Sequence, residues 1–337
     1  MSIEKHIQEL RKEILELKEK RNAVILAHSY QSPYVQDTAD FVGASLQLAQ
    51  KAQNLDYDVI VFAGVDFMAN TAKILNPDKT VLIPDNRAEC PLAKMLRAED
   101  LREAKKKYPK APVLLYTNTT AECQALADII YTAGNAIDIV DKMAKESGSD
   151  TIIFGPDVNM AYFVGKRLNC KGEVKTRDGI KTIKGLENGN RLLYLPSEGF
   201  CNPHIRIFPE TIQEMRKKYP NAKVLVHSEC YPAVQESADF VGSTGDMVKY
   251  VKESEAREFI IGTERDFCYR LKTVIPDRCY YPVGKLNGDD IICPNMKLHS
   301  LDRIRDSLKY NIYEVNVSED IAKNAKIAIE TMLKYTK

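Results

Sequence analysis

VILAHSY at residues 24–30, followed by Gln36 and by ADFV at residues 39–42, is the first of three matching segments in this chain. The second has PVLLYTN at 112–118, then Gln124 and ADII at 127–130; the third has KVLVHSE at 223–229, then Gln235 and ADFV at 238–241. In each segment the glutamine lies eight residues, and the aspartate twelve, after the histidine or tyrosine that ends the apolar run (His28, Tyr116 and His227). A spacing kept three times indicates an internal repeat.

Two further apolar runs follow each segment. The first run, at 59–62, 151–154 and 259–261, ends at or near a glycine, and the second, at 81–84, 192–196 and 279–282, ends in proline. From Gly64, Gly155 and Gly262 to these prolines the interval is 20, 41 and 20 residues, so the second copy carries an insertion. We place it near 170–190 as a surface excursion, because that stretch is rich in Lys, Gly and Asn.

Short apolar runs that alternate with longer amphipathic stretches predict βαβ units with parallel strands, and therefore an α/β fold. One large doubly wound sheet is the alternative, but it would not explain the equal Gln and Asp spacing. We predict three repeated three-layer α/β domains: 22–109 with an N-terminal helix at 1–21, 110–220 with the insertion, and 221–308, followed by a C-terminal extension at 309–337 with a helix from about 318.

One cysteine follows the last proline of each repeat, by 6, 5 and 11 residues: Cys90, Cys201 and Cys293. If the repeats surround a pseudo-threefold axis, the three thiols converge at a central site. Three thiolates suit a [4Fe–4S] cluster with one iron free of protein ligands, and that iron can act as a Lewis acid. Zinc is the alternative, although structural zinc sites usually have four protein ligands. The remaining cysteines are expected to be small buried apolar residues, except that Cys230 beside Glu229 stays open: Cys123, Cys170, Cys268 and Cys279.

The loops at the carboxyl ends of parallel strands are the expected active-site positions. Helical stretches begin near Ser45, Thr132 and the pair Ser243 and Thr244, where hydroxyl and N–H groups can bind carboxylate or phosphate. Simple N-capping is the alternative, but recurrence in several copies favours ligand binding.

His28 and His227 occupy equivalent positions at the ends of two predicted strands, so we expect a functional role for both. Glu229 is a candidate acid or base, with a pKa tuned toward neutrality by burial. His204 could orient the loop of Cys201 or bind an anion.

The charge balance argues against nucleic-acid and membrane partners. The chain has 48 basic and 47 acidic side chains and a formal net charge of +1, which creates no strong field for either. No apolar run approaches the roughly 20 residues that span a bilayer, and residues 1–21 lack a signal-peptide core. We expect a cytosolic protein with reduced cysteines. The overall charge balance is compatible with a local basic pocket for a small anion.

Several long motifs resemble quinolinate synthase, the A protein of NAD biosynthesis, over nearly the whole chain. They are the stretch 24–48, VIVFAGVDFMANTAKILNP at 59–77, VHSEC at 226–230, STG at 243–245 and TERDFCYRL at 263–271. The resemblance implies a [4Fe–4S] cluster on Cys90, Cys201 and Cys293. It also implies condensation of iminoaspartate with dihydroxyacetone phosphate, with loss of phosphate and water, and as a partner an enzyme that produces iminoaspartate.

The resemblance also implies roles for residues that match the family motifs. Glu229 and Tyr30 would transfer protons and His227 would polarise the substrate, with Tyr116 as a further catalytic residue. The residues implied in substrate binding are His28, Ser45, Asn118, Thr132, Ser243 and Thr244, of which Ser45, Asn118 and Thr244 would hold carboxylate or phosphate.

Six positions depart from the family motifs. The family reads HNY, DSL, TSAN, GHC and TGG, and has Glu at one further position, where this chain has Ser29, Ala44, Ala133, Phe200, Asp246 and Asn70. Most of these are expected near the cavity. Two interpretations stay open: a true quinolinate synthase, or a paralogue that uses the same cluster for dehydration or sulfur transfer on another small acidic substrate. A redox sensor is a third hypothesis, and the neutral charge balance disfavours it.

Overall fold

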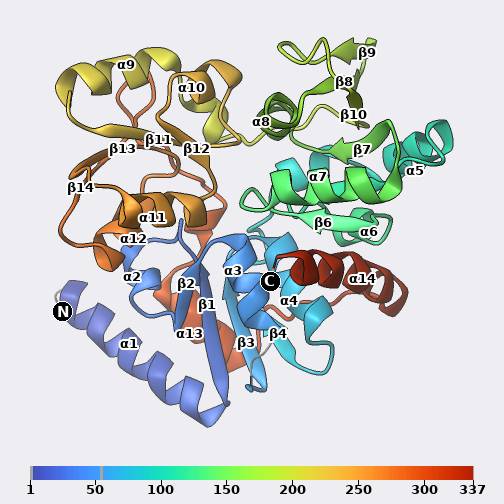
Figure 1. Cartoon of the computed structure of the whole chain (residues 1–337). Helices are drawn as coiled ribbons and strands as arrows, with labels where there is room; N and C mark the ends of the chain where they lie inside the picture. The colour runs from blue at the N-terminus through green and yellow to red at the C-terminus, as the bar shows by residue number, and fades with distance from the viewer. Residues whose placement is uncertain (1–2, 54–55, 337) are drawn as a thin grey trace.

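The computed structural model describes residues 3–53 and 56–336 and has an α/β architecture with three predominantly parallel sheets (Figure 1). The first sheet has the order β2 (Phe41–Gly43), β1 (Ala23–His28), β3 (Val59–Ala63) and β4 (Thr80–Leu82). The third has the same pattern: β12 (Phe240–Gly242), β11 (Lys223–His227), β13 (Glu258–Gly262) and β14 (Cys279–Pro282). Three separate sheets exclude one large doubly wound sheet.

The second sheet extends this pattern. Its order is β6 (Ile129–Tyr131), β5 (Val113–Tyr116), β7 (Thr151–Gly155), β10 (Arg191–Leu195), β8 (Cys170–Thr176) and β9 (Gly179–Thr182). β8 pairs parallel with β10 and antiparallel with β9. The insertion therefore extends the sheet through β8, whereas residues 177–182, which include β9, and much of 184–190 are exposed, so the expected surface excursion is correct only for this second part. Buried Cys170 and Val174 explain the difference, because they alternate with more exposed residues along β8.

Each sheet contains one short strand more than the three per repeat that the sequence predicts. β2, β6 and β12 have three residues each and pair parallel with the first strand of their sheet. Three residues are too few to show a period. These strands matter because each leads directly into a helix whose start lies near the cavity described below.

The repeated aspartate holds the first strand of each sheet. Its Oδ2 accepts the backbone N–H of Ile25, Val113 or Val224, at 2.7, 2.7 and 2.8 Å from Asp40, Asp128 and Asp239 respectively. The aspartate precedes the short edge strand, so this hydrogen bond fixes the register between the edge strand and the first strand.

The repeated glutamine holds the loop that follows each first strand. Gln124 Nε2 donates to the carbonyls of Thr117 and Thr119 at 3.1 and 3.2 Å. Gln36 and Gln235 bond the equivalent carbonyls, those of Ser29 and Gln31 and of Ser228 and Cys230. The three glutamines are buried, so an internal amide replaces the water that these carbonyls would otherwise bind.

The helices cover the sheets. α1 (Ile3–Lys20) packs on the first sheet, and α14 (Glu319–Tyr335) buries Ala325, Ile329 and Met332 in the core of the second. The helices that lie within one repeat are α2 (Pro33–Gln36), α3 (Ser45–Ala52), α4 (Asp66–Leu75), α6 (Ala121–Gln124), α7 (Ala136–Ser147), α8 (Val158–Leu168), α10 (Pro232–Glu236), α11 (Thr244–Glu253) and α12 (Phe267–Val274). No helix in the described residues is long and apolar enough to cross a membrane.

Three helices carry the chain from one sheet to another. α5 (Ala98–Lys107) packs in the core of the second sheet, α9 (Pro209–Lys218) in that of the third, and α13 (Leu301–Tyr310) in that of the first. Each helix follows one of the three predicted ligand cysteines. The three sheets are thereby joined in a closed circuit, with a cysteine loop at each crossing.

We expect Gln124→Leu to lower the free energy of unfolding by about 1–3 kcal/mol, because among the described residues it leaves the Thr119 carbonyl without a donor and the Thr117 carbonyl with the N–H of Thr119 alone. Gln213→Leu on the exposed face of α9 is the matched control, with a change within about 0.5 kcal/mol. Urea unfolding of both variants measures the difference. Equal stability of the two variants would contradict this role.

Candidate active site

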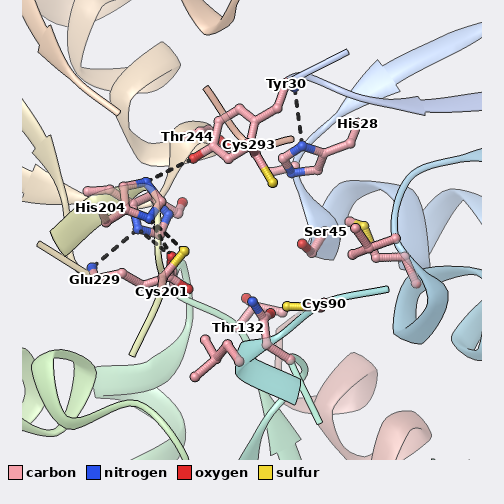
Figure 2. Close-up of a pocket in the computed structure, with 18 of the residues that line it drawn as sticks. His28, Tyr30, Ser45, Cys90, Thr132, Cys201, His204, Glu229, Thr244 and Cys293 are labelled. Carbon is pink, nitrogen blue, oxygen red and sulfur yellow. Dashed lines mark hydrogen bonds and ion pairs between the residues drawn. The ribbon is translucent and has the colours of Figure 1, made fainter. Parts of the chain in front are cut away.

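All the residues singled out from sequence as catalytic, substrate-binding or metal-ligating line one cavity of about 390 Å³ (Figure 2). They reach it from the carboxyl ends of strands in all three sheets, as parallel α/β sheets predict. The set is His28, Tyr30, Ser45, Cys90, Tyr116, Asn118, Thr132, Cys201, His227, Glu229, Ser243, Thr244 and Cys293.

Two buried histidines end the first strands of the first and third sheets. His28 Nδ1 accepts the backbone N–H of Tyr30 at 3.2 Å, and His227 Nδ1 accepts that of Glu229 at 3.3 Å. Burial lowers the pKa of both rings to about 3. In the neutral ring an accepting Nδ1 leaves the proton on Nε2, so each histidine is suited to donate a hydrogen bond to a substrate oxygen.

Glu229 is a buried anion, and the expectation of a near-neutral pKa is wrong. Burial acts to raise its pKa, but His227, His204 and Tyr116 lower it to about 2. His204 Nδ1 lies 2.7 Å from Glu229 Oε2, whereas His227 Nδ1 is 3.5 Å away. A carboxylate with so low a pKa is a weak base, so this geometry favours orienting its neighbours over taking up a proton.

A hydrogen-bonded chain connects Tyr30 with Glu229. The Tyr30 hydroxyl lies 2.6 Å from Thr263 Oγ1, which lies 2.8 Å from His204 Nε2, and His204 in turn contacts Glu229. Burial raises the pKa of Tyr30 and of Tyr116 well above its ordinary value. Both phenols therefore stay protonated and can act as donors.

Thr263 is a polar residue of this network that the sequence analysis did not select. It directly follows the last residue of β13, where the other two repeats have the apolar residues Val65 and Pro156. That difference between the repeats was the available signal. His204, left open from sequence, lies at the centre of the network, and its ring stacks on that of His227 at 4.4 Å between centroids.

Each cavity cysteine precedes a short 3-10 turn: η1 (Leu92–Met95), η2 (His204–Arg206) and η3 (Met296–Leu298). Backbone N–H groups of these turns donate to sulfur, Ala93 to Cys90, and Asn295 and Met296 to Cys293. The backbone N–H of Cys90 donates to Asp66 Oδ1 at 3.0 Å. These backbone groups thus fix the direction of the Cys90 and Cys293 thiols, and the Cys201 sulfur lies 3.1 Å from His204 Nδ1.

The three thiols suit a bound cation. Burial raises the pKa of all three, and thiolate charges on Cys90 and Cys293 raise that of Cys201 further. Three half-buried thiolates in one cavity are unfavourable together unless a metal centre neutralises them. Hydrogen-bonded cysteine sulfurs that converge from three sides fit an iron–sulfur cluster.

A second donor set shares one of these cysteines. Ligand atoms of Cys201, His204 and Glu229 lie within 4.8 Å of one another and could hold one metal ion. However, two ligands on one zinc ion are roughly 3.3 Å apart, given zinc–ligand bonds near 2 Å and tetrahedral geometry. The 2.7 Å between His204 and Glu229 is instead a hydrogen-bond distance, which favours the three-cysteine set.

The polar side chains predicted to bind substrate are of two kinds, those without a hydrogen-bond partner in the protein and those with one. Ser45, Asn118 and Thr244 have no hydrogen-bond partner for their side chains within residues 3–53 and 56–336. By contrast, the Thr132 hydroxyl donates to Asn135 at 3.1 Å and that of Ser243 to Asp246 at 2.6 Å. Ser243 is also the N-cap of α11. The capping interpretation therefore holds for Ser243, while the first three residues remain free for a ligand.

The residues that depart from the family motifs, and the cysteines outside the predicted ligand set, lie partly inside and partly outside the cavity. Ala44, Ala133 and Asp246 line the cavity, but Ser29, Asn70 and Phe200 do not, so only half of the departures from the family motifs lie there. Cys123 and Cys170 are buried, as predicted, whereas Cys268 is half-buried. Exposed Cys279 contradicts the prediction because it begins the edge strand β14. Cys230 is buried in the core of the third sheet and does not line the cavity.

The fold and the cavity are those of an α/β enzyme in which residues from three separate sheets, among them three cysteines, line a single active site. The family model described as quinolinate synthetase A protein matches residues 12–334. The chain belongs to this family and is an enzyme.

Curated relatives named quinolinate synthase match almost the whole chain. The protein of Pyrococcus furiosus is 48% identical over 330 residues, which cover 98% of this chain and 99% of that protein. The protein of Methanothermobacter thermautotrophicus is 43% identical over 331 residues, covering 98% and 99%. The protein of Thermotoga maritima is 42% identical over 320 residues, covering 95% and 97%.

The buried histidines predict a loss of stability in acid. Below pH about 6.5 an unfolded histidine binds a proton, whereas folded His28 stays neutral down to about pH 3. The unfolded state then binds more protons, so the free energy of unfolding falls as the pH falls. His28→Gln should reduce the fall between pH 6.5 and 5 by about 2 kcal/mol.

Urea unfolding at several pH values measures this difference. Gln213→Leu, at an exposed position on α9, is the control; it removes no titratable group and should leave the pH dependence unchanged. An unchanged pH dependence in His28→Gln would show that the ring is protonated in the folded protein.

Proposed function

We propose that this enzyme is a [4Fe–4S]-dependent quinolinate synthase that condenses iminoaspartate with dihydroxyacetone phosphate, with loss of phosphate and water. The observation that carries the proposal is the meeting of Cys90, Cys201 and Cys293 with unpartnered polar side chains in one cavity. Relatives that are named quinolinate synthase and match nearly the full length support the same reaction. A cytosolic location, where thiols stay reduced, and a partner enzyme that supplies iminoaspartate belong to this proposal.

The proposal includes three domains related by pseudo-threefold symmetry, at 22–109, 110–220 and 221–308. Matching strand orders in the three sheets support it. Further support comes from the three crossover helices, each of which follows a cysteine loop that lines the cavity. Each domain would then contribute one thiol, one first-strand end and one helix start.

Cys90, Cys201 and Cys293 would hold the cluster, whose open iron would supply Lewis-acid chemistry. Ser45, Asn118 and Thr244 would bind carboxylate and phosphate oxygens, since their side chains have no protein partner in the described part of the chain. His28 and His227 would donate hydrogen bonds to a substrate oxygen, with Thr132 and Ser243 lining the cavity. Proton transfer would fall to Tyr30 and Tyr116, oriented through His204 and Glu229.

A paralogue that acts on another small acidic substrate, by dehydration or sulfur transfer, is the second candidate. Two differences within the cavity favour it: Ala133 lacks the hydroxyl of the family motif, and Asp246 adds a carboxylate. This candidate keeps the cluster and the fold.

Cluster ligation has a direct test. Anaerobically purified protein is expected to be brown, with about four irons per chain, and Cys90→Ala, Cys201→Ala and Cys293→Ala should each lose iron. Cys279→Ala, which removes an exposed thiol outside the cavity, is the control and should keep it. Full iron retention in any of the three cavity variants would remove that cysteine from the ligand set.

The reaction has a separate test. The iron-loaded enzyme, given iminoaspartate and dihydroxyacetone phosphate, should form quinolinate, detected by chromatography. An intact cluster without product would favour the paralogue.

A further inference from the structure

The loop that carries Tyr30 is held both by its own sheet and by the third sheet. Gln36 bonds the two backbone carbonyls that flank the carbonyl of Tyr30. The Tyr30 carbonyl itself accepts a hydrogen bond from the ammonium group of Lys297, which lies in the turn η3. Gln36 Nε2 also donates to the carbonyl of Asp266, in the segment after β13, at 3.2 Å. Both contacts attach the Tyr30 loop to segments that follow the third sheet's strands.

The loop that carries Glu229 is attached to the second sheet in a parallel way. Gln235 bonds the two carbonyls that flank the carbonyl of Glu229, and its Nε2 also donates to the carbonyl of Asn159 at 3.2 Å. The side-chain amide of Asn159 then donates to the Glu229 carbonyl at 3.1 Å. Asn159 and Asp266 are equivalent, because each lies four residues after the glycine that ends β7 or β13. A carboxylate has no hydrogen to donate, so Asp266 cannot hold the Tyr30 carbonyl in the same way.

Lys297 supplies the donor that Asp266 lacks. Its Nζ donates to Asp266 Oδ2 at 2.7 Å and forms an ion pair with Glu264 Oε1 at 2.8 Å. Glu264 is fully buried, and a buried carboxylate without a cationic partner is costly. The ammonium group is therefore held between two acids and the Tyr30 carbonyl. Lys297 does not line the cavity, so any effect that it has on a ligand passes through other residues.

The same part of the chain contacts both ends of Tyr30. The Tyr30 hydroxyl lies 2.6 Å from Thr263 Oγ1, and Thr263 directly precedes Glu264. The backbone N–H of Lys297 donates to the carbonyl of Cys293 at 3.3 Å. The residue that holds the Tyr30 carbonyl thus belongs to the turn that follows one of the three cavity cysteines.

We propose that Lys297 is a positioning residue that holds the hydroxyl of Tyr30 where it can transfer a proton to a substrate bound beside Cys293. Glu264 and Asp266 keep the ammonium group of Lys297 in place. A displacement of about 1 Å in a reacting group can lower a rate roughly a hundredfold, so a residue outside the cavity can control the reaction in this way. The inference deepens the proposed function and rests on it, because Tyr30 transfers a proton there.

The test is a double variant, Lys297→Met with Glu264→Gln, in the iron-loaded enzyme. It removes the donor without leaving a bare buried carboxylate, and Asp266 keeps its ion pair with Arg265 at 2.9 Å. The double variant should therefore melt at a higher temperature than Lys297→Met alone. The amide hydrogens of residues 29–31 should nevertheless exchange about tenfold faster than in the parent, measured by mass spectrometry. The kcat for quinolinate formation should fall about tenfold, with KM changed by less than about twofold.

Lys272→Met is the matched control. Lys272 Nζ also bonds two backbone carbonyls, at 2.6 and 3.1 Å, but in the segment after α12 and outside the cavity. This variant should change kcat and the exchange of residues 29–31 by less than about twofold. In a Tyr30→Phe background, the double substitution should likewise change kcat by less than about twofold, because the hydroxyl that Lys297 positions is absent.

The alternative is that Lys297 only neutralises the buried Glu264. It predicts that the double variant keeps the kcat of the parent and its exchange at residues 29–31, and that result would overturn the proposal. An equal loss of kcat with and without the Tyr30 hydroxyl would overturn it too. A parent enzyme that forms no quinolinate would count against the proposed function alone. The exchange of residues 29–31 is measured without substrate, so it still decides whether Lys297 holds the Tyr30 loop.

Discussion

Six hydrogen-bonding side chains hold the loops on which the cavity depends. In each sheet an aspartate accepts an N–H of the first strand, and a glutamine donates to carbonyls of the loop that follows it. These loops carry His28, Tyr30, Asn118 and Glu229 to one place. Because buried backbone groups are costly to leave unpaired, replacing any of these side chains has consequences for the loop and not for a local contact alone. The three-fold repetition of the glutamine and aspartate spacing in the sequence has its physical reason here.

Around these loops the chain forms a circuit. Each cysteine loop leads into a helix that packs on a different sheet, so the loops are held at both ends by separate hydrophobic cores. Such an arrangement brings three thiols to one cavity and resists their displacement even when their charges repel. It also explains how one cavity is lined by residues as far apart in sequence as Cys90 and Cys293.

The cavity has two sides that differ in hydrogen bonding: on one the polar side chains bond one another, and on the other they are available to a ligand. On one side, Tyr30, His204 and Glu229 are joined through Thr263, which is buried behind the cavity wall, in a closed hydrogen-bonded network. The side containing Ser45, Asn118 and Thr244 offers donors that have no partner among the residues described, and it suits the acidic substrates of the proposed reaction. Asp246 lies next to this second side and adds a charge that Gln47 and Asn135, which take the same position in the other two repeats, do not have.

The sequence by itself determined the α/β class, the repeat, the family and thirteen polar residues that prove to line the cavity, because these depend on local periodicity, on spacing and on motifs carried within single loops. Only the tertiary structure decided the low pKa of Glu229, the contact of Thr263 with Tyr30 and His204, and the use of Ser243 by Asp246 instead of by a ligand. It also decided that the insertion near 170–190 pairs with β10 and that α13 packs on the first sheet. All of these depend on which distant segments are buried together, and on the desolvation and hydrogen bonding that follow, which a linear pattern does not encode.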